Sequence, residues 1–308
     1  MNRTAILPLV LAILFAAGLL LPALTTGYWL GVALTFFMWV GLVQSWVILS
    51  GLTGYLSLGH AVFYGLGAYV MVLTWGQVPF ELAILGAGLA CVLLAVAIGV
   101  PCLRVRGPYF VILTFGVSEL VKFIVVNIEA GLGRAGRLIF GAPLIETLYY
   151  WIVILALVAT ALAFLVSHSR LGSGLRAIRE DETAAETTGV PVTRLKVIAF
   201  ALSAFVPGMV GAVMVLRTTY FETIHVFNPI TSFTIVTIAI IGGSDDVRGP
   251  ILGAAFLMIL SETLLVNAPE IYMIILGALL ILFVLLVPKG IAGGLTGLIA
   301  RRRREAGS

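Results

Sequence analysis

The sequence predicts an all-α fold: a polytopic bundle of about ten transmembrane helices in a single domain over residues 1–308. Composition is the first reason, because 61% of the 308 residues are hydrophobic, 10% are charged and the mean hydropathy is +1.17. Such a chain has too little polar surface for a soluble domain of its length. The second reason is a series of apolar runs of about 20 residues, the length of helix that crosses roughly 30 Å of hydrocarbon.

The apolar runs define the predicted spans in order along the chain. They are Ile6–Leu24, Tyr28–Leu49, Leu56–Trp75, Phe80–Val100, Tyr109–Ile128, Ile145–Val166, Lys196–Leu216, Pro229–Ile241, Ile251–Val266 and Ile271–Val287.

Two of these spans have a second interpretation. The first has the basic start and apolar core of a secretory signal peptide, but its run is long for one and has no clean A-x-A site, which favours a retained helix. The eighth, Pro229–Ile241, is short and has a re-entrant alternative. We expect it to cross, because a re-entrant segment would place Lys289 and the cluster Arg301–Arg304 outside.

The basic residues predict the orientation. With Arg3 inside, most of the 18 Lys and Arg residues fall in cytoplasmic segments, as the positive-inside rule expects, so both termini should be cytoplasmic. The net charge of +4 therefore indicates topology rather than nucleic-acid binding, since no basic patch with interleaved aromatic residues is present. Arg301–Arg304 is an inside anchor, and attraction to anionic lipid of about 1 kcal/mol per cation is its second interpretation.

The two cysteines, Cys91 and Cys102, form no CxxC motif, so they indicate packing rather than a disulfide or a metal site. We expect no catalytic residue, no cofactor and no metal.

Residues 169–196 form the only long polar segment between apolar runs, and the segment is short, helix-prone and basic. Glycines precede the predicted helix and Gly189-Val190-Pro191 stops it. Its apolar positions near one helical face are Leu175, Ile178, Thr183 and Ala184. The charged positions on its other faces are Arg176, Arg179, Glu180 and Asp181. Such a helix can insert its apolar ridge into a partner, or it can lie on the lipid surface.

Six blocks, in order over nearly the whole chain, give a resemblance. They are Gly51–Tyr69, Arg106–Leu120, Ser169–Val190, Lys196–Ala212, Gly242–Ala254 and Ile275–Leu295. Together they resemble the permease subunits of branched-chain amino acid ABC importers, specifically the M-type (LivM-like) member of the permease pair. The resemblance departs at Asp245, where the family commonly has another glycine.

The resemblance implies that residues 169–196 are a cytoplasmic coupling loop that meets an ATPase. Import permeases carry an EAA-type pattern, which Glu182, Ala184, Ala185 and Gly189 resemble, although Glu182 lies one position further from the alanines than in the commonest form. The glycine permits a sharp turn after the helix. The remaining residues expected in the coupling loop are Leu175, Arg176, Ile178 and Arg179.

The chain contains no Walker A pattern, so the ATPase must be another polypeptide. The resemblance implies an H-type permease, two ATP-binding subunits and an extracytoplasmic solute-binding protein as partners, in a bacterial or archaeal cytoplasmic membrane. It favours leucine, isoleucine and valine as substrates; other amino acids, urea and short amides remain alternatives.

Polar groups inside the spans are candidates for the solute pathway, because ionisable groups in hydrocarbon are costly. Glu119 and Lys122 lie three positions apart and should neutralise one another as an ion pair. We expect His60 to be a hydrogen-bonded packing residue. Thr234 and Thr237 either bond neighbouring helices or face a solute path, and packing is the first interpretation.

Two other classes of protein are disfavoured. An ion-driven secondary transporter should carry several buried carboxylates and an inverted repeat, neither of which is apparent. An intramembrane enzyme needs a convergent nucleophile and base or metal ligands, and the sequence has neither a Ser-His grouping nor HExxH.

Overall fold

A computed structural model of the chain describes residues 27–133, 136–244 and 247–267, with scattered positions between 15 and 25 and between 274 and 293. The predicted first and tenth spans lie largely outside the described residues, as do Asp245, Lys289 and the cluster Arg301–Arg304.

The described chain is almost entirely helical, as predicted. Its elements are α2 (Gly27–Trp46), the π-helix η1 (Val47–Gly51), α3 (His60–Thr74), α4 (Phe80–Cys102), α5 (Pro108–Gly131), β1 (Arg137–Leu138), α6 (Ile145–His168), α7 (Arg170–Glu180), α8 (Glu182–Thr187), α9 (Val192–Met214), the 3₁₀ helix η2 (Val215–Arg217), β2 (Tyr220–Phe221), α10 (Thr223–Val226), α11 (Ile230–Gly242) and α12 (Arg248–Asn267). The short strands β1 and β2 pair antiparallel, with Arg137 opposite Phe221.

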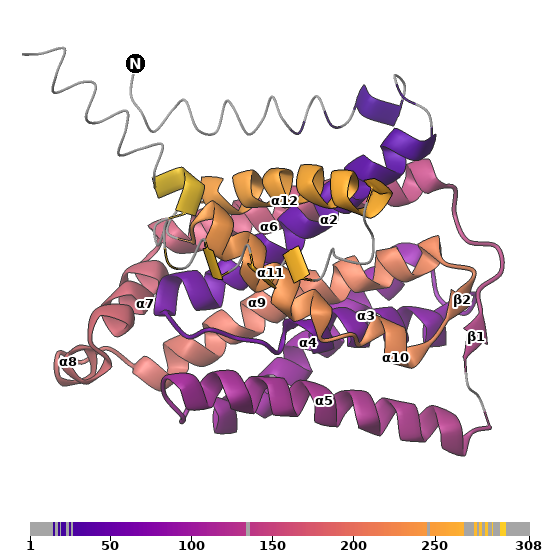
Figure 1. Cartoon of the computed structure of the whole chain (residues 1–308). Helices are drawn as coiled ribbons and strands as arrows, with labels where there is room; N and C mark the ends of the chain where they lie inside the picture. The colour runs from indigo at the N-terminus through magenta and orange to yellow at the C-terminus, as the bar shows by residue number, and fades with distance from the viewer. Residues whose placement is uncertain are drawn as a thin grey trace, which may run out of the picture.

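The long helices form one bundle with two distinct ends. Figure 1 shows α7 and α8 projecting from one end and the β1–β2 pair at the other, with α5 along one side. Within the described residues, six helical stretches are long and apolar enough to cross a membrane. They are Gly27–Gly51, Phe80–Cys102, Pro108–Gly131, Ile145–His168, Val192–Arg217 and Thr223–Gly242.

Helix α9 is the centre of the bundle and packs against α2, α3, α4 and α6. Its contact with α3 is close enough that a Cβ at Gly67 would overlap the backbone carbonyl of Gly208. Small residues at helix crossings permit this approach, because association in lipid depends on van der Waals packing rather than on a hydrophobic driving force. Movement of α9 therefore has to involve its neighbours.

The predicted third span, Leu56–Trp75, is wrong at its start. Residues 54–59 are irregular and α3 begins at His60, which leaves 15 residues of helix. At 1.5 Å per residue this is about 22 Å, shorter than the hydrocarbon core. Hydroxyl groups satisfy the irregular backbone: Ser50 Oγ accepts from Ser57 N at 3.3 Å, and Thr114 Oγ1 accepts from Leu58 N at 3.2 Å. These side-chain bonds replace the helical ladder.

The predicted eighth span corresponds to α11, which has 13 residues. Helix α10 precedes it, and a break at Asn228 and Pro229 separates the two. Asn228 Oδ1 accepts from Ile230 N at 3.0 Å, which stabilises the start of α11. Only with α10 does this stretch reach the length of a membrane span. The full crossing of Pro229–Ile241 stays a prediction.

Candidate functional site

The polar segment 169–196 folds as two helices rather than the single helix predicted. The Ser169 side chain caps α7, and Asp181 ends α7 and caps α8 by accepting from Thr183 N at 2.8 Å and Ala184 N at 3.0 Å. An aspartate in this position satisfies amide groups that the first helical turn leaves free, which makes a new helix start possible. The segment also ends earlier than predicted, because α9 begins at Val192, directly after Pro191.

The apolar ridge of this segment faces its own bundle. Leu175 is 0% exposed, Ile178 3% and Ala185 4%, and all three belong to a buried cluster that continues into the core between α3, α4 and α9. Thr183 and Ala184, predicted on the same face as Leu175, are exposed instead. That prediction is wrong because the break at Asp181 turns α8 relative to α7. The ridge therefore fixes the segment to the bundle and is not free for a partner.

Two arginines add hydrogen bonds that hold this segment in place, and a glycine forms the turn after α8. Arg179 Nη1 donates to the Gly51 carbonyl at 2.9 Å, and Arg176 Nη2 donates to the Ser167 carbonyl at 2.8 Å. Gly189 has φ +88°, a conformation that side chains with a Cβ rarely adopt. This confirms the predicted turn after α8.

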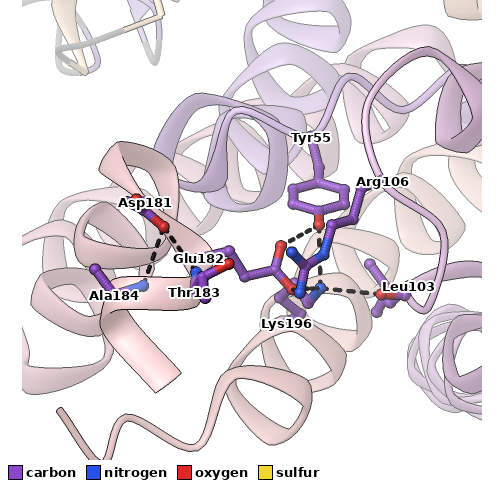
Figure 2. Close-up of polar contacts among 8 residues, drawn as sticks. All are labelled: Tyr55, Leu103, Arg106, Asp181, Glu182, Thr183, Ala184 and Lys196. Carbon is purple, nitrogen blue, oxygen red and sulfur yellow. Dashed lines mark hydrogen bonds and ion pairs between the residues drawn. The ribbon is translucent and has the colours of Figure 1, made fainter. Parts of the chain in front are cut away.

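Four charged or polar side chains, Tyr55, Arg106, Glu182 and Lys196, form what we call the anchor cluster (Figure 2). Lys196 Nζ lies 2.9 Å from Glu182 Oε1, and Arg106 Nη2 lies 3.2 Å from the same oxygen. The Tyr55 hydroxyl donates to Glu182 Oε2. The four residues come from the irregular segment 54–59, the α4–α5 connection, α8 and α9. The cluster thus joins α8 directly to the central helix.

Lys196 is unusual in this cluster because it is buried, with 2% of its surface exposed. Its ammonium also donates to the Leu103 carbonyl at 3.0 Å and to the Tyr55 hydroxyl at 3.2 Å, and it lies 4.6 Å from the centre of the Tyr55 ring. A buried ammonium needs such partners, because it loses its hydration on folding. Glu182 is the counter-charge that makes this position tolerable.

The environment of Glu182 favours its ionised form. Burial raises the pKa of the carboxyl group, but the hydrogen bonds from Lys196 and Tyr55, with the positive charges of Lys196 and Arg106, outweigh burial and lower the pKa below its ordinary value of 4.5. Glu182 is therefore a carboxylate at neutral pH. The cluster holds two cations around one anion.

A cavity of about 590 Å³ lies at the opposite end of the bundle, where α2 and α6 begin and α9 ends. Its polar lining comes from Tyr28, Thr35, Arg217, His225, Asn228, Thr231, Thr234, Ser261 and Glu262. Its large apolar lining side chains are Val32, Trp39, Ile145, Ile230, Leu257 and Met258. Concave sites of roughly 300–1,000 Å³ with a mostly apolar wall and a few polar groups are typical of small-molecule binding.

Comparison with known proteins identifies the family. The model of the family described as "Branched-chain amino acid transport system / permease component" matches residues 28–284. The chain belongs to this family. It is therefore an integral membrane protein, in agreement with the six apolar helical stretches found in its described part. The family description makes it a permease component of a transport system.

Curated relatives of the permease agree with this. The chain is 28% identical to the "High-affinity branched-chain amino acid transport system permease protein LivM" of Salmonella typhimurium and to the protein of the same name from Escherichia coli, over 79% of this chain and 65% of each relative. It is 26% identical to the "Ribose import permease protein RbsC" of Escherichia coli over 48% of this chain and 47% of that relative. The matched part of the chain thus spans less than two thirds of the LivM proteins. No solved structure matches the permease.

The candidate pathway residues of the permease do not form one site. Thr234 lines the 590 Å³ cavity, whereas Thr237 is buried and donates to the Phe233 carbonyl at 2.8 Å. Glu119 and Lys122 form the predicted ion pair on α5, with Nζ and Oε2 2.5 Å apart. A role for these residues in transport stays a prediction.

His60 differs from its prediction. It is fully buried at the start of α3, but neither ring nitrogen has a hydrogen-bond partner among the described residues. The ring packs edge-on against Phe63, with centroids 5.7 Å apart. Within the described residues, the expectation of a hydrogen-bonded histidine is wrong. The hydroxyl oxygens of Ser50, Ser57 and Thr114 accept from backbone amides of residues 57–59.

Several residues of these sites were missed from the sequence. Tyr55 and Arg106 carried no recognisable signal, and Lys196 was expected only as the end of the loop. Arg217 does carry a signal in the sequence. It is a cation on the side of the membrane where the positive-inside rule predicts few, which makes it a candidate for a functional role. The structure also places Glu262 in the lining of the cavity with Arg217.

Proposed function

We propose that the chain is one permease subunit of a binding-protein-dependent ABC importer in the cytoplasmic membrane, moving leucine, isoleucine and valine inward. An H-type permease would complete the membrane part, two separate subunits would hydrolyse ATP, and an extracytoplasmic protein would deliver the solute. The α7–α8 end and both termini would then be cytoplasmic, and the cavity would face outward.

The observation that carries this proposal is the two-sided construction of α7 and α8. One side is fixed to the bundle through Leu175, Ile178 and Ala185, and the anchor cluster ties α8 to α9. The other side of α8 exposes Thr183, Ala184, Glu186 and Thr187. A module attached this firmly to the central helix can pass a push from a cytoplasmic partner to the bundle, whereas a helix that merely rests on lipid needs no such attachment.

In this mechanism, closure of the ATP-bound subunits displaces α8 and, through Lys196, the start of α9. Because α9 packs against α2, α3, α4 and α6, its displacement changes the arrangement of the bundle and alternates access to the solute path. The ion pair transmits force in both directions, since separation would leave the Lys196 ammonium unpaired in the protein interior.

The decisive test is uptake of labelled leucine by proteoliposomes that hold the complete complex with its binding protein, with and without ATP inside. We expect uptake only with ATP. Ala184→Arg should abolish association with the ATPase subunits and uptake while leaving the melting temperature of the permease unchanged, because Ala184 is exposed. Ala142→Arg, the same exposed substitution at the opposite end, is the matched control. Uptake without ATP, or normal uptake by Ala184→Arg, would contradict the proposal.

A second candidate is import of a sugar, because the ribose permease RbsC is also a relative. Urea and short amides are further alternatives. ATP hydrolysis stimulated by ribose or urea, but not by leucine, in the same proteoliposomes would retain the mechanism and replace the substrate.

A further inference from the structure

The outward cavity contains two opposite charges that do not neutralise each other. Arg217 and Glu262 both line it, and within the described residues neither forms an ion pair. We propose that this cavity binds the zwitterionic head group of an amino acid, with Arg217 holding the carboxylate and Glu262 the ammonium. The proposal rests on the function proposed above and specifies where the permease recognises its substrate.

Neutral partners hold each charge in place. The Tyr28 hydroxyl donates to Glu262 Oε1. Arg217 Nη1 donates to Thr35 Oγ1 at 3.2 Å, and a Cβ at Gly31 would lie 3.2 Å from Arg217 Nη2. These contacts orient both charged groups without neutralising their charges. Several donors of the guanidinium and the second carboxylate oxygen are therefore left for a ligand.

Helix α2 fixes the spacing of the two charges. Tyr28, Gly31 and Thr35 are spaced as i, i+3 and i+7, so they lie along one face of the helix. At 1.5 Å per residue, the part of α2 that contacts Arg217, between Gly31 and Thr35, is centred about 7 Å along the axis from Tyr28, which contacts Glu262. Two charge-assisted hydrogen bonds of about 2.8 Å, added to about 3 Å between the amine and carboxylate of an amino acid, span a similar length.

The charges select the ligand class. An anionic ligand needs only the arginine and a cationic ligand only the glutamate. A sugar can hydrogen-bond to both side chains, but it carries no charge that neutralises either of them. A zwitterion satisfies both, and it has a reason to be bound where a cation and an anion are held apart. Besides Tyr28, which donates to Glu262, the lining has one more titratable group, His225. It already has a neighbour, because its Nε2 lies 3.3 Å from Glu222 Oε2.

The remaining wall suits an aliphatic side chain. Val32, Trp39, Ile145, Leu257 and Met258 line the same cavity. Burial of a branched side chain against such a wall is favourable, because it removes apolar surface from water. The combination of opposite charges with an aliphatic wall matches leucine better than serine or an acidic amino acid.

Equilibrium binding to the purified complete complex, without its solute-binding protein, tests this site. We expect labelled leucine to bind. Isocaproate, which lacks the ammonium, and isoamylamine, which lacks the carboxylate, should each displace it about tenfold or more weakly than unlabelled leucine does. Arg217→Gln and Glu262→Gln should each weaken leucine binding by about tenfold or more. Glu146→Gln, at an exposed glutamate in the first turn of α6, and Arg104→Gln, at an exposed arginine, should bind like wild type.

Competition by the two analogues distinguishes the loss of one charge from a folding defect, because each variant should lose its selectivity against only one analogue. Arg217→Gln should no longer distinguish leucine from isoamylamine, and Glu262→Gln should no longer distinguish it from isocaproate. Unchanged leucine binding by both variants, equal competition by both analogues in wild type, or no leucine binding by wild type would each overturn the site. If a variant fails to fold, the wild-type analogue series decides alone.

The outcome is separable from that of the proposed function. ATP-driven leucine uptake by a wild-type complex that shows no binding at this cavity would remove the site and leave the importer. Charge-selective leucine binding without ATP-driven uptake would remove the importer and leave the site.

Discussion

Lys196 and Glu182 are joined by an ion pair of 2.9 Å between Nζ and Oε1, and this pair links α8 to α9. Lys196 is almost completely buried, whereas Glu182 is close to the surface. The two partners are therefore not equivalent. Loss of the glutamate leaves a cation inside the protein, while loss of the lysine leaves an anion that water and Arg106 can still stabilise.

Glu182→Gln should destabilise the permease substantially. Breaking a buried ion pair on one side costs about 3–5 kcal/mol, because the remaining charge is uncompensated. The variant Lys196→Met should be less affected, and the double variant should recover much of the loss. Melting temperatures in detergent measure the series, with Glu186→Gln, an exposed neighbour on α8, as control. Equal losses for Glu182→Gln and Glu186→Gln would show that the pair adds nothing.

The contribution of Glu182 should depend on pH. Its pKa in the folded protein lies below the ordinary value of 4.5, so the unfolded chain binds its proton first as pH falls. The stabilisation is complete above the unfolded pKa and is lost as pH falls through the folded pKa. The difference in melting temperature between wild type and Glu182→Gln should thus be constant near neutrality and shrink below pH about 4. A difference that stays constant down to pH about 3 would assign it to shape rather than charge.

Apolar length predicted most of the spans but not their interruptions. Phe80–Val100 and Ile145–Val166 agree with α4 and α6 within a few residues, because a membrane helix is specified by a continuous apolar run. The irregular residues 54–59 escaped prediction, since hydropathy is an average over a window. Their backbone is stabilised by hydroxyls such as Thr114, which are remote in the sequence.

The candidate sites, too, could be predicted only in part from the sequence. The polarity of residues 169–196 located the loop, but the anchor cluster draws one residue from each of four separate segments. Arg217 and Glu262 likewise line the same cavity, and each of them contacts α2, through Thr35 and Tyr28 respectively. Proximity of this kind is created by packing, and no spacing along the chain encodes it.

Gly67→Ala should separate α3 from α9. The added methyl group would overlap the Gly208 carbonyl, a backbone atom that cannot rotate away. Overpacking of this kind costs about 1–3 kcal/mol and shifts the helices apart. Gly86→Ala on α4 is the matched control, because a Cβ there has nothing within 4 Å. It gains the same helix propensity without an overlap, so its melting temperature should be unchanged or slightly higher. A Gly67→Ala protein as stable as the control would contradict the close approach of these helices.

His60→Leu should preserve or raise the thermal stability of the permease. The imidazole is fully buried, and within the described residues both its nitrogens lack a partner, so its polarity costs about 1–3 kcal/mol that leucine does not incur. His60→Gln, which keeps a polar group of similar size, should bring no such gain. Melting temperature and ATP-driven leucine uptake, measured on the same complexes, separate the two roles open to this residue. A packing role predicts that both survive in His60→Leu, whereas loss of uptake at unchanged stability would assign the histidine to transport.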